Sequence, residues 1–374
     1  MENLSTEIGD GIHATPLYDD NGTYYFVNGN NISEYGITIT PTTQRVTEAE
    51  AYRNNANILC SETILLSING TIGNVALYKG EPIMLGKSAC YINVSTKVNK
   101  HYIFHYLMMP KCQFYFTSEL TGTTIKNLSL KSVRMTNVSL PNLKEQNRIA
   151  QLFDAIDERI ATQNKIIDKL QTLIRGINQK VFLCNGVDYK LGELCEIKSG
   201  YSGNQLTMKM GLKVSRIETI SGHKINMERI GYVAPFNSSE NYKLRVGEIL
   251  FSNINSVEYI GNTAFIDKDY DLYHGMNLLR LVPNVSVVMP FYLYLLLNTN
   301  KMINHFKTIC NKAVSQASIN QTELGKTVIQ IPNLKAQKQI CELYQAIYAK
   351  LESEKYVDSL YQSQRQYLLR QMFI

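Results

Sequence analysis

The chain has 374 residues, more than one hydrophobic core usually serves, so two globular units with connecting elements are expected. Hydrophobic residues make up 44% and charged residues 19%, an ordinary globular composition that gives little support to extended disorder. Lys and Arg outnumber Asp and Glu by 38 to 32, a formal charge of +6, which permits a polyanionic partner without requiring one.

Targeting and cross-linking signals are missing from the sequence. The first seven residues lack the basic and apolar regions of a signal peptide, and the longest apolar stretch, Val287 to Leu297, is broken by Pro290 and too short for a membrane span. We therefore expect a soluble cytoplasmic protein. The seven cysteines are odd in number and scattered, so neither a disulfide framework nor a zinc site is expected.

The first globular part is assigned to residues 1–140 and is expected to be rich in strands. Segments 23–27, 64–68 and 74–78 combine β-branched and aromatic residues and are bounded by Asn-Gly, Gly and Asn turns. The short apolar segment from His101 to Met109 predicts a helix. These features favour an α+β domain with a small core.

A long helix is predicted in the segment 141–185. Asn142 follows Pro141 and has Glu145 three residues on, which is the arrangement of a capping box. Apolar residues then recur at helical spacing over many turns, with no proline to interrupt them. The buried stripe of this helix is assigned to Ile149, Leu152, Ile156, Ile160, Ile167, Leu170, Ile174 and Ile177.

The second half of the chain has the same order of elements. Residues 186–331 form a second strand-rich part, with a strand expected at 248–252 and a short helix at 290–300. A second long helix is predicted in 332–374; it has Ala336 in place of Glu145, so we expect its start to fray. Its buried stripe is assigned to Ile340, Leu343, Ile347, Leu351, Leu360 and Leu368.

The two halves are copies of one unit. Residues 72–76 (Ile-Gly-Asn-Val-Ala) return as 260–264 (Ile-Gly-Asn-Thr-Ala), and residues 141–144 (Pro-Asn-Leu-Lys) return as 332–335. Gln146 matches Gln337 in the same alignment. Several short blocks in the same order, at an offset of about 190 residues, indicate a repeat made of a globular part followed by a helix.

The two long helices are expected to pair. Each has about 40 residues and would be roughly 60 Å long, too long for one small domain to cover. We therefore predict an α+β fold in which two similar strand-rich domains are separated by two long antiparallel helices that form an intramolecular coiled coil. The alternative is two separate helices, each docked on its own domain.

No catalytic pattern is complete. Residues 86–88 (Gly-Lys-Ser) resemble the end of a phosphate-binding loop, but the required earlier glycine is replaced by Glu81, so Lys87 is interpreted as a solvated loop lysine. Asp188, Glu196 and Lys198 fit a nuclease pattern only loosely and lack a second carboxylate cluster. Patterns of dinucleotide binding, serine hydrolases and amino-methyltransferases are absent, and the six histidines show no zincin spacing. We expect a non-catalytic chain that binds no metal or cofactor itself.

Two segments carry a resemblance to a known family. Residues 140–149 (Leu-Pro-Asn-Leu-Lys-Glu-Gln-Asn-Arg-Ile) and 331–340 (Ile-Pro-Asn-Leu-Lys-Ala-Gln-Lys-Gln-Ile) resemble the central and C-terminal helix starts of the specificity subunit of Type I restriction-modification systems. Weaker likenesses cover the openings of the two recognition domains, at 9–16 and 189–200. The resemblance spans essentially the whole chain. It implies that each target-recognition domain reads one half of a bipartite DNA site, while the helices act as a ruler for the spacer.

The resemblance also implies partners. Two modification subunits, which carry the methylation chemistry, would bind the helices, and restriction subunits with motor and nuclease activity would join them. S-adenosylmethionine, ATP and magnesium are expected in those partners and not in this chain. Candidates for the docking surface are the apolar helix positions left over after pairing, together with Arg148, Arg159, Lys338 and Lys350.

Contacts with double-stranded DNA are expected from polar and basic loop residues. Arg and Lys pair with guanine edges or phosphates, and Asn pairs with adenine edges. The candidates are His13, Thr15, Tyr18, Asn28, Asn31, Arg45, Arg53 and Lys126 in the first domain, and Tyr201, Lys209, Lys213, Arg216, Lys224 and Arg229 in the second. Two other functions stay open: a coiled-coil scaffold that binds proteins without DNA specificity, and an endonuclease with an unrecognised active site.

Overall fold

The computed structural model describes residues 1–34, 36–54, 56–122, 126–180, 186–312 and 316–373. These residues form two compact units, one of residues 1–167 and 354–374 and the other of residues 168–353. Each unit combines a globular domain with parts of two 38-residue helices, α5 (Leu143–Lys180) and α10 (Leu334–Gln371). Domain 1 denotes the part of unit 1 before α5, and domain 2 the part of unit 2 between the helices. Residues 181–185, the end of the expected central helix segment, lie outside the described residues.

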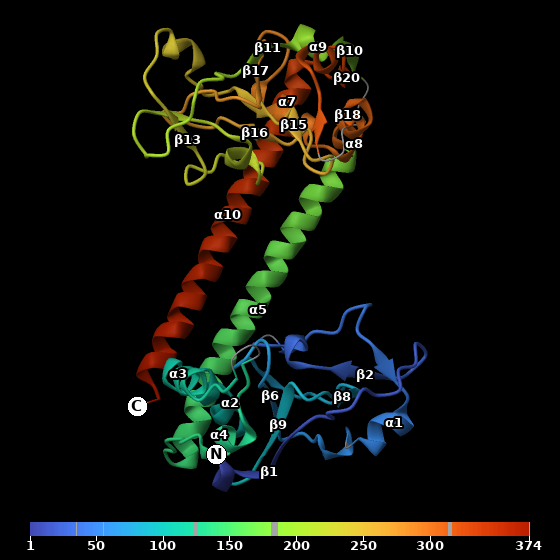
Figure 1. The fold of residues 1–374 in the computed structure, drawn as a ribbon, viewed down its shortest axis with the longest axis vertical. Helices are drawn as coiled ribbons and strands as arrows, with labels where there is room; N and C mark the ends of the chain where they lie inside the picture. Colours follow the sequence, from blue (N-terminus) through green and yellow to red (C-terminus); the bar gives the residue numbers. More distant parts are fainter. Residues whose placement is uncertain (35, 55, 123–125, 181–185, 313–315, 374) are drawn as a thin grey trace. The chain divides into compact units, whose positions relative to one another are not determined.

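Domain 1 is built on an antiparallel sheet (Figure 1). Its strand order is β1-β9-β6-β7, and a smaller sheet, β5-β2-β8, contains one parallel pair, β2 with β8. The strands are β1 (Ser5–Asp10), β2 (Tyr24–Val27), β3 (Ile32–Ser33), β4 (Gly36–Ile37), β5 (Arg45–Val46), β6 (Thr63–Ser67), β7 (Val75–Leu77), β8 (Ile83–Leu85) and β9 (Ala89–Val94). The helices are α1 (Glu48–Arg53), α2 (Lys100–Met108), α3 (Pro110–Ser118) and α4 (Leu130–Met135).

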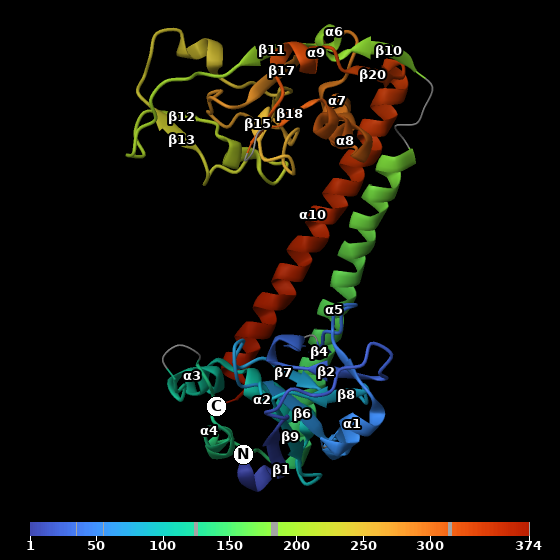
Figure 2. The same cartoon turned by 45° about the vertical axis from the view of Figure 1, so that its right-hand side comes forward.

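Domain 2 repeats this topology (Figure 2). Its main sheet has the order β11-β17-β14-β16, the counterpart of β1-β9-β6-β7, and α7 and α8 take the places of α2 and α3. The strands of domain 2 are β10 (Val187–Lys190), β11 (Cys195–Ser199), β12 (Leu212–Val214), β13 (Gly231–Val233), β14 (Ile249–Phe251), β15 (Ile254–Asn255), β16 (Thr263–Phe265), β17 (Leu279–Pro283), β18 (Asn311–Lys312), β19 (Ala317–Ser318) and β20 (Val328–Ile331). The helices are α6 (Leu191–Leu194), α7 (Pro290–Leu297), α8 (Asn300–Ile309) and α9 (Gln321–Gly325). The predicted duplication and the α+β class are confirmed.

The same glutamine joins each long helix to its domain. The Gln146 side chain accepts a hydrogen bond from the Asn99 backbone N–H at 3.0 Å and donates one to the Pro141 carbonyl at 2.8 Å. Gln337 likewise accepts from the Met289 N–H at 2.8 Å and donates to the Pro332 carbonyl at 2.9 Å. Both side chains are buried, so each fixes the helix start against the N-terminus of a short domain helix.

The two helix starts are capped alike. Asn142 Oδ1 accepts from the Glu145 N–H at 3.0 Å, and Asn333 Oδ1 accepts from the Ala336 N–H at 3.0 Å. The Asn cap therefore satisfies the N–H group at that position in both copies, while the expected fraying of the second start stays a prediction.

Each long helix completes the core of its domain. In unit 1, Phe153 of α5 is fully buried in the cluster that contains Ile64 of β6 and Ile103 of α2. Phe373, just after α10, stacks on Phe153 with ring centroids 5.5 Å apart. The helices are therefore part of the hydrophobic cores and not separate appendages.

The helices pair in antiparallel fashion. In unit 1, the Arg365 Nε of α10 lies 2.5 Å from Asp157 Oδ1 of α5, and Gln163 donates a hydrogen bond to the Glu354 carbonyl at 2.9 Å. In unit 2, the Tyr344 hydroxyl donates to Asn178 Oδ1. Because contacts move forward along one helix as they move backward along the other, the prediction of an antiparallel pair is confirmed.

The buried stripe differs in part from the predicted one. On α5 the inward positions recur at alternate steps of four and three residues, which is the 3.5-residue period of a coiled coil. That period places Phe153 and not Leu152 on the stripe, and Tyr344 and not Leu343. Leu152, Leu343 and Leu360 are 40%, 45% and 50% exposed, so their assignment to the core is wrong. The inward positions are Ile149, Phe153, Ile156, Ile160, Gln163, Ile167, Leu170, Ile174 and Ile177 on α5, and Tyr344, Ile347, Leu351, Glu354, Asp358, Tyr361, Arg365 and Leu368 on α10. Ile340, also assigned to the stripe, is half-buried against the core of domain 2.

The corrected stripe predicts a contrast between two adjacent residues. Phe153→Ala removes a fully buried ring and is expected to lower the free energy of unfolding by about 3–5 kcal/mol. Leu152→Ala, on the flank of the same helix, is expected to cost about 1 kcal/mol or less. Urea unfolding of the two variants beside the unaltered chain measures both values. Equal losses would contradict the assignment.

Candidate nucleic-acid interface

Two loops of each domain are held together at the same place in the repeat. In domain 1, Ile12 forms a parallel bridge with Gly86, and in domain 2, Tyr201 forms the equivalent bridge with Gly275. The preceding glycines, Gly11 and Gly200, have no room for a side chain, because a Cβ there would overlap the carbonyl of Leu85 or of Gly275. Each bridge joins the loop after the first strand of the main sheet to the loop before β9 or β17.

In domain 1 this arrangement gathers residues 11–13, 28–29 and 86–88. Ser88 donates its hydroxyl hydrogen to Asn28 Oδ1 at 2.9 Å and accepts from the Gly29 N–H at 2.9 Å. His13 is exposed on the adjoining loop, with its Nε2 2.9 Å from Asp10 Oδ2. Lys87 is exposed between the two packed residues of its loop. The phosphate-loop-like segment 86–88 therefore belongs to the candidate interface, and Lys87, interpreted from the sequence as a solvated loop lysine, becomes a further candidate contact.

Two predicted contacts of domain 1 also have structural roles. The Asn28 side chain is engaged by Ser88, and Asn31 Oδ1 accepts from the Asn28 N–H at 3.0 Å while its amide donates to the Thr38 carbonyl at 3.0 Å. These bonds shape the turn η2 (Gly29–Asn31). The DNA-contacting role of Asn28 and Asn31 stays a prediction.

The remaining candidates of domain 1 are spread over its surface. Tyr18 packs edge-on against Phe26 with centroids 5.8 Å apart, and the Arg45 guanidinium lies 5.0 Å from the Tyr25 ring centroid. Backbone contacts between the Tyr18 and Arg45 segments place these two together. Three others lie elsewhere: Thr15 is exposed, Arg53 is paired with Glu50 on α1 at 3.2 Å, and Lys126 is exposed beyond the α3 segment.

Domain 2 carries a surface depression of about 350 Å³ at the equivalent loops. We call it the domain-2 depression; it is lined by Ser202, Gly203, Asn204, Gln205, Arg216, Ile217, Glu218, Met276 and Asn277. Among the predicted contacts, only Arg216 lies in this lining. The amides of Asn204, Gln205 and Asn277 are further candidates that were not predicted from the sequence, although aligning Gly86 with Gly275 in the repeat would have drawn attention to Asn277.

The other predicted residues of domain 2 lie around this depression or away from it. Tyr201 stacks on Phe236 with centroids 3.7 Å apart, and Lys213 lies 3.7 Å from Asp271. The ammonium group of Lys224 lies 3.1 Å from Glu352 of α10, which places this lysine beside the helix. Lys209 and Arg229 are exposed. The DNA-contacting role of all these residues stays a prediction.

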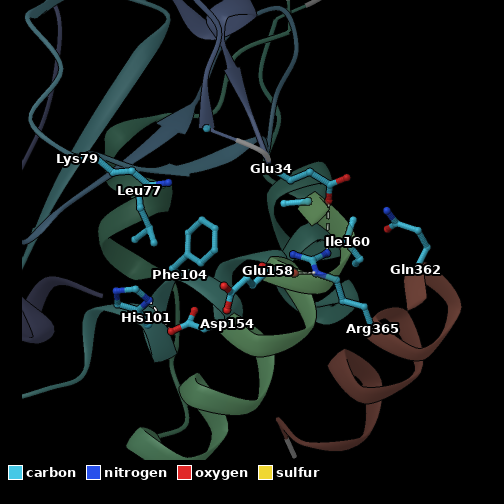
Figure 3. Close-up of a pocket in the computed structure, with 13 residues that line it drawn as sticks. Glu34, Leu77, Lys79, His101, Phe104, Asp154, Glu158, Ile160, Gln362 and Arg365 are labelled. Carbon is cyan, nitrogen blue, oxygen red and sulfur yellow. Dashed lines mark hydrogen bonds and ion pairs between the residues drawn. The ribbon is translucent and has the colours of Figure 1, made fainter. Parts of the chain in front are cut away.

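A charged cluster joins domain 1 to both helices (Figure 3). It surrounds a pocket of about 310 Å³ in unit 1. His101 and His105 of α2 place ring nitrogens 2.8 Å and 2.9 Å from the two carboxylate oxygens of Asp154 on α5. Arg365 of α10 lies between Asp157 of α5 and Glu34 of the β3–β4 loop, at 2.5 Å and 3.4 Å. The Arg365 side chain is itself buried, so removing it would take away the guanidinium partner that these two carboxylates share.

The predicted docking residues lie on the exposed helix surfaces. Arg148 is within 3.6 Å of Glu145, Lys338 is within 3.9 Å of Glu342, and Arg159 and Lys350 are exposed. Leu152 and Leu343, which occupy the same position in the two repeats, are both partly exposed next to these charges. Leu152 and Leu343 are therefore candidates for the apolar part of the expected docking surface.

Metal and membrane sites are not indicated in the parts of the chain that the structure describes. No group of three or more His, Cys, Asp or Glu side chains there could hold a metal ion, and the six described cysteines are free thiols. None of the described helices is long and apolar enough to cross a membrane.

Comparison with known proteins matches both halves of the chain. The sequence profile of the Type I restriction modification DNA specificity domain fits residues 11–172 and 186–358. The putative type I restriction enzyme MjaX specificity subunit of Methanocaldococcus jannaschii is 43% identical over 163 residues, 42% of this chain and 38% of that subunit. The EcoBI specificity subunit of Escherichia coli is 22% identical over 343 residues, 80% of this chain and 69% of that subunit. The match to the MjaX subunit thus covers less than half of its length.

A solved structure shares the fold. The S subunit of a Type-I restriction-modification system from M. genitalium aligns over 100% of this chain and 94% of its own, with a TM-score of 0.62 at 17% identity. Two repeated α+β domains with paired long helices are thus the architecture of a restriction-modification specificity subunit. By the match of both halves, the chain belongs to the family of Type I restriction modification DNA specificity domains, of which it carries two copies.

The Asp154 carboxylate makes the stability of unit 1 depend on pH. Burial alone would raise its pKa, but hydrogen bonds and charge from His101 and His105 outweigh burial and hold the pKa well below its usual value of 3.8. Because the folded-state pKa is lowered, this stabilisation is fully present above about pH 4 and is lost as the pH falls through the folded value.

Asp154→Asn is therefore expected to reduce the loss of stability on acidification. Urea unfolding between about pH 6 and about pH 3 measures it, with Asp20→Asn, which removes an exposed carboxylate of the same unit, as the control. If Asp154→Asn and Asp20→Asn show the same pH dependence, the imidazole–carboxylate cluster does not contribute.

Proposed function

We propose that this chain is the DNA-sequence specificity subunit of a Type I restriction-modification complex and is itself non-catalytic. Each recognition domain reads one half of a bipartite double-stranded site. The observation that carries the proposal is a repetition in both domains. Each has the same sheet order and the same pair of bridged surface loops, next to a glycine that has no room for a side chain. Two copies of one reading module are what a two-part site requires.

The partners in this proposal are two modification subunits and further restriction subunits. S-adenosylmethionine, ATP and magnesium would be bound by those partners. Leu152 on α5 and Leu343 on α10 occupy matching positions and offer one docking surface for each modification subunit, with Arg148 on the first helix and Lys338 on the second as nearby charges.

The primary test is the pattern of methylation. The chain is co-expressed with the modification subunit encoded beside it, and methylated adenines are mapped in DNA treated with the purified complex. The proposal expects one motif of two parts separated by a fixed gap. The proposal fails if the modification subunit forms no stable complex with this chain and no methylated motif appears. The chain would then be better explained as a protein-binding scaffold.

The docking surface predicts the effect of a charge at either matching leucine. Leu152→Glu and Leu343→Glu are each expected to weaken binding of the modification subunit about tenfold or more, because an exposed apolar anchor is lost. Titration by analytical ultracentrifugation or calorimetry measures this. An unchanged free energy of unfolding in each variant serves as the control, and an unchanged affinity in both would remove these leucines from the interface.

The helix pair is proposed to set the spacer between the half-sites. Deleting one heptad from each helix, residues 166–172 and 347–353, keeps the 3.5-residue register and shortens each by about 10 Å. The gap in the methylated motif is expected to shrink by about three base pairs, since base pairs stack about 3.4 Å apart. Inserting a heptad at the same places is the matched variant and should lengthen the gap. A gap that stays constant in both variants would contradict the ruler.

A further inference from the structure

The lining of the domain-2 depression suits base edges better than phosphates. Its one cation, Arg216, has its Nε 3.5 Å from Glu218 Oε2, so the positive charge is balanced at the site. The other polar side chains are one hydroxyl and three neutral amides. Affinity for phosphates comes from net positive charge, whereas base edges are read by directional hydrogen bonds.

The loop that carries Asn277 is held rigidly. Asn277 has a backbone φ of +63°, a left-handed conformation that few non-glycine residues adopt. On one side, the Gly275 N–H donates to the Ser215 hydroxyl at 3.0 Å, and a Cβ at Gly275 would overlap the Ser215 carbonyl. On the other side, the buried His274 donates its Nε2–H to the Leu278 carbonyl at 3.0 Å. Burial lowers the pKa of His274 to about 4, so this ring is neutral near pH 7.

The same surface presents further hydrogen-bonding and apolar groups. A Cβ added to Gly231 would lie 3.0 Å from Gln205 Oε1 and 3.1 Å from Arg216 Cδ, so these two side chains lie side by side over that glycine. Asn277 and Gln205 are exposed, and Met276 beside Asn277 is 37% exposed. Neither amide side chain takes part in a hydrogen bond with another described residue, so both are available to a ligand.

Resting on the proposed function, we propose that the domain-2 depression reads an A·T base pair in the major groove. Asn277 donates to N7 of adenine and accepts from its N6 amino group, the bidentate pairing that only an amide side chain offers to adenine. Met276 contacts the thymine methyl group, and Gln205 provides a second amide for the neighbouring base. The fixed backbone of residues 274–278 orders the Asn277 amide before DNA binds.

The test alters single atoms of the DNA while the protein stays unchanged. The full chain is assembled with its modification subunits. Its Kd for duplexes that contain the sequence motif found by methylation mapping is measured by fluorescence anisotropy at fixed salt. Replacing each adenine by 7-deazaadenine removes N7, and replacing each thymine by uracil removes the methyl group. At one A·T pair of one half-site, 7-deazaadenine is expected to weaken binding about tenfold to a hundredfold, and uracil to weaken it less.

A variant of the protein tests whether Asn277 is the side chain that contacts the adenine. Asn277→Asp keeps the shape and tolerates the positive φ, but it lacks the amide donor and places a carboxylate oxygen against N7. It should lose at least as much affinity as 7-deazaadenine causes, and the analogue should then cost no further affinity. Asn304→Asp, an exposed residue on α8 of the same domain, makes the same charge change away from the depression and should bind like the unaltered chain.

The failures of the two proposals are distinguishable. If no two-part motif is methylated, the proposed function fails. If the motif exists but 7-deazaadenine costs the same affinity in Asn277→Asp as in the unaltered complex, or costs nothing at any position, only the reading of A·T by this depression is overturned.

Discussion

A 38-residue helix with an apolar face is stable in water only when that face is covered, and here the two long helices cover each other. The 3.5-residue period of their stripes keeps the contact continuous, and the same stripes enter the domain cores through residues such as Phe153. Gln146 and Gln337 then fix each helix start to its own domain. These attachments determine where the surface loops of each domain lie relative to the helix that is joined to that domain.

Polar residues within the helix contacts favour one register over its alternatives. Gln163 with Glu354, and Arg365 with Asp157, take places that apolar side chains would fill more favourably, and a shift by one heptad would leave them unpaired. The contacts between a domain and the long helices also differ in chemistry between the two units. In the repeat alignment, His101 and Asp157 of unit 1 correspond to Phe291 and Tyr348 of unit 2. The contact between domain and helix is therefore charged in one copy and aromatic in the other. Two copies that have diverged in this way fit two modules with separate binding specificities.

The sequence contained enough information for the architecture but not for the interface. Helical periodicity and the repeated Pro-Asn-Leu-Lys blocks predict the long helices and the duplication, because these features depend on local spacing. Leu152 and Leu360 were misassigned because a 3.6-residue pattern and a 3.5-residue pattern differ by one flank position, which only the partner helix decides. The hydrogen bond from Ser88 to Asn28 could not be predicted, because it joins residues sixty positions apart in the sequence. Asn277 was not recognised because its exposure and its left-handed backbone arise from packing between three loops.

The central claim is that the two domains are independent readers on a common helical frame. The most direct measurement replaces residues 1–140 by the equivalent domain of a related specificity subunit and maps the methylated motif of the complex. The account predicts that one half of the motif changes while the other half and the gap stay the same. If both halves change, or neither does, the two domains do not read the DNA separately and the account is contradicted.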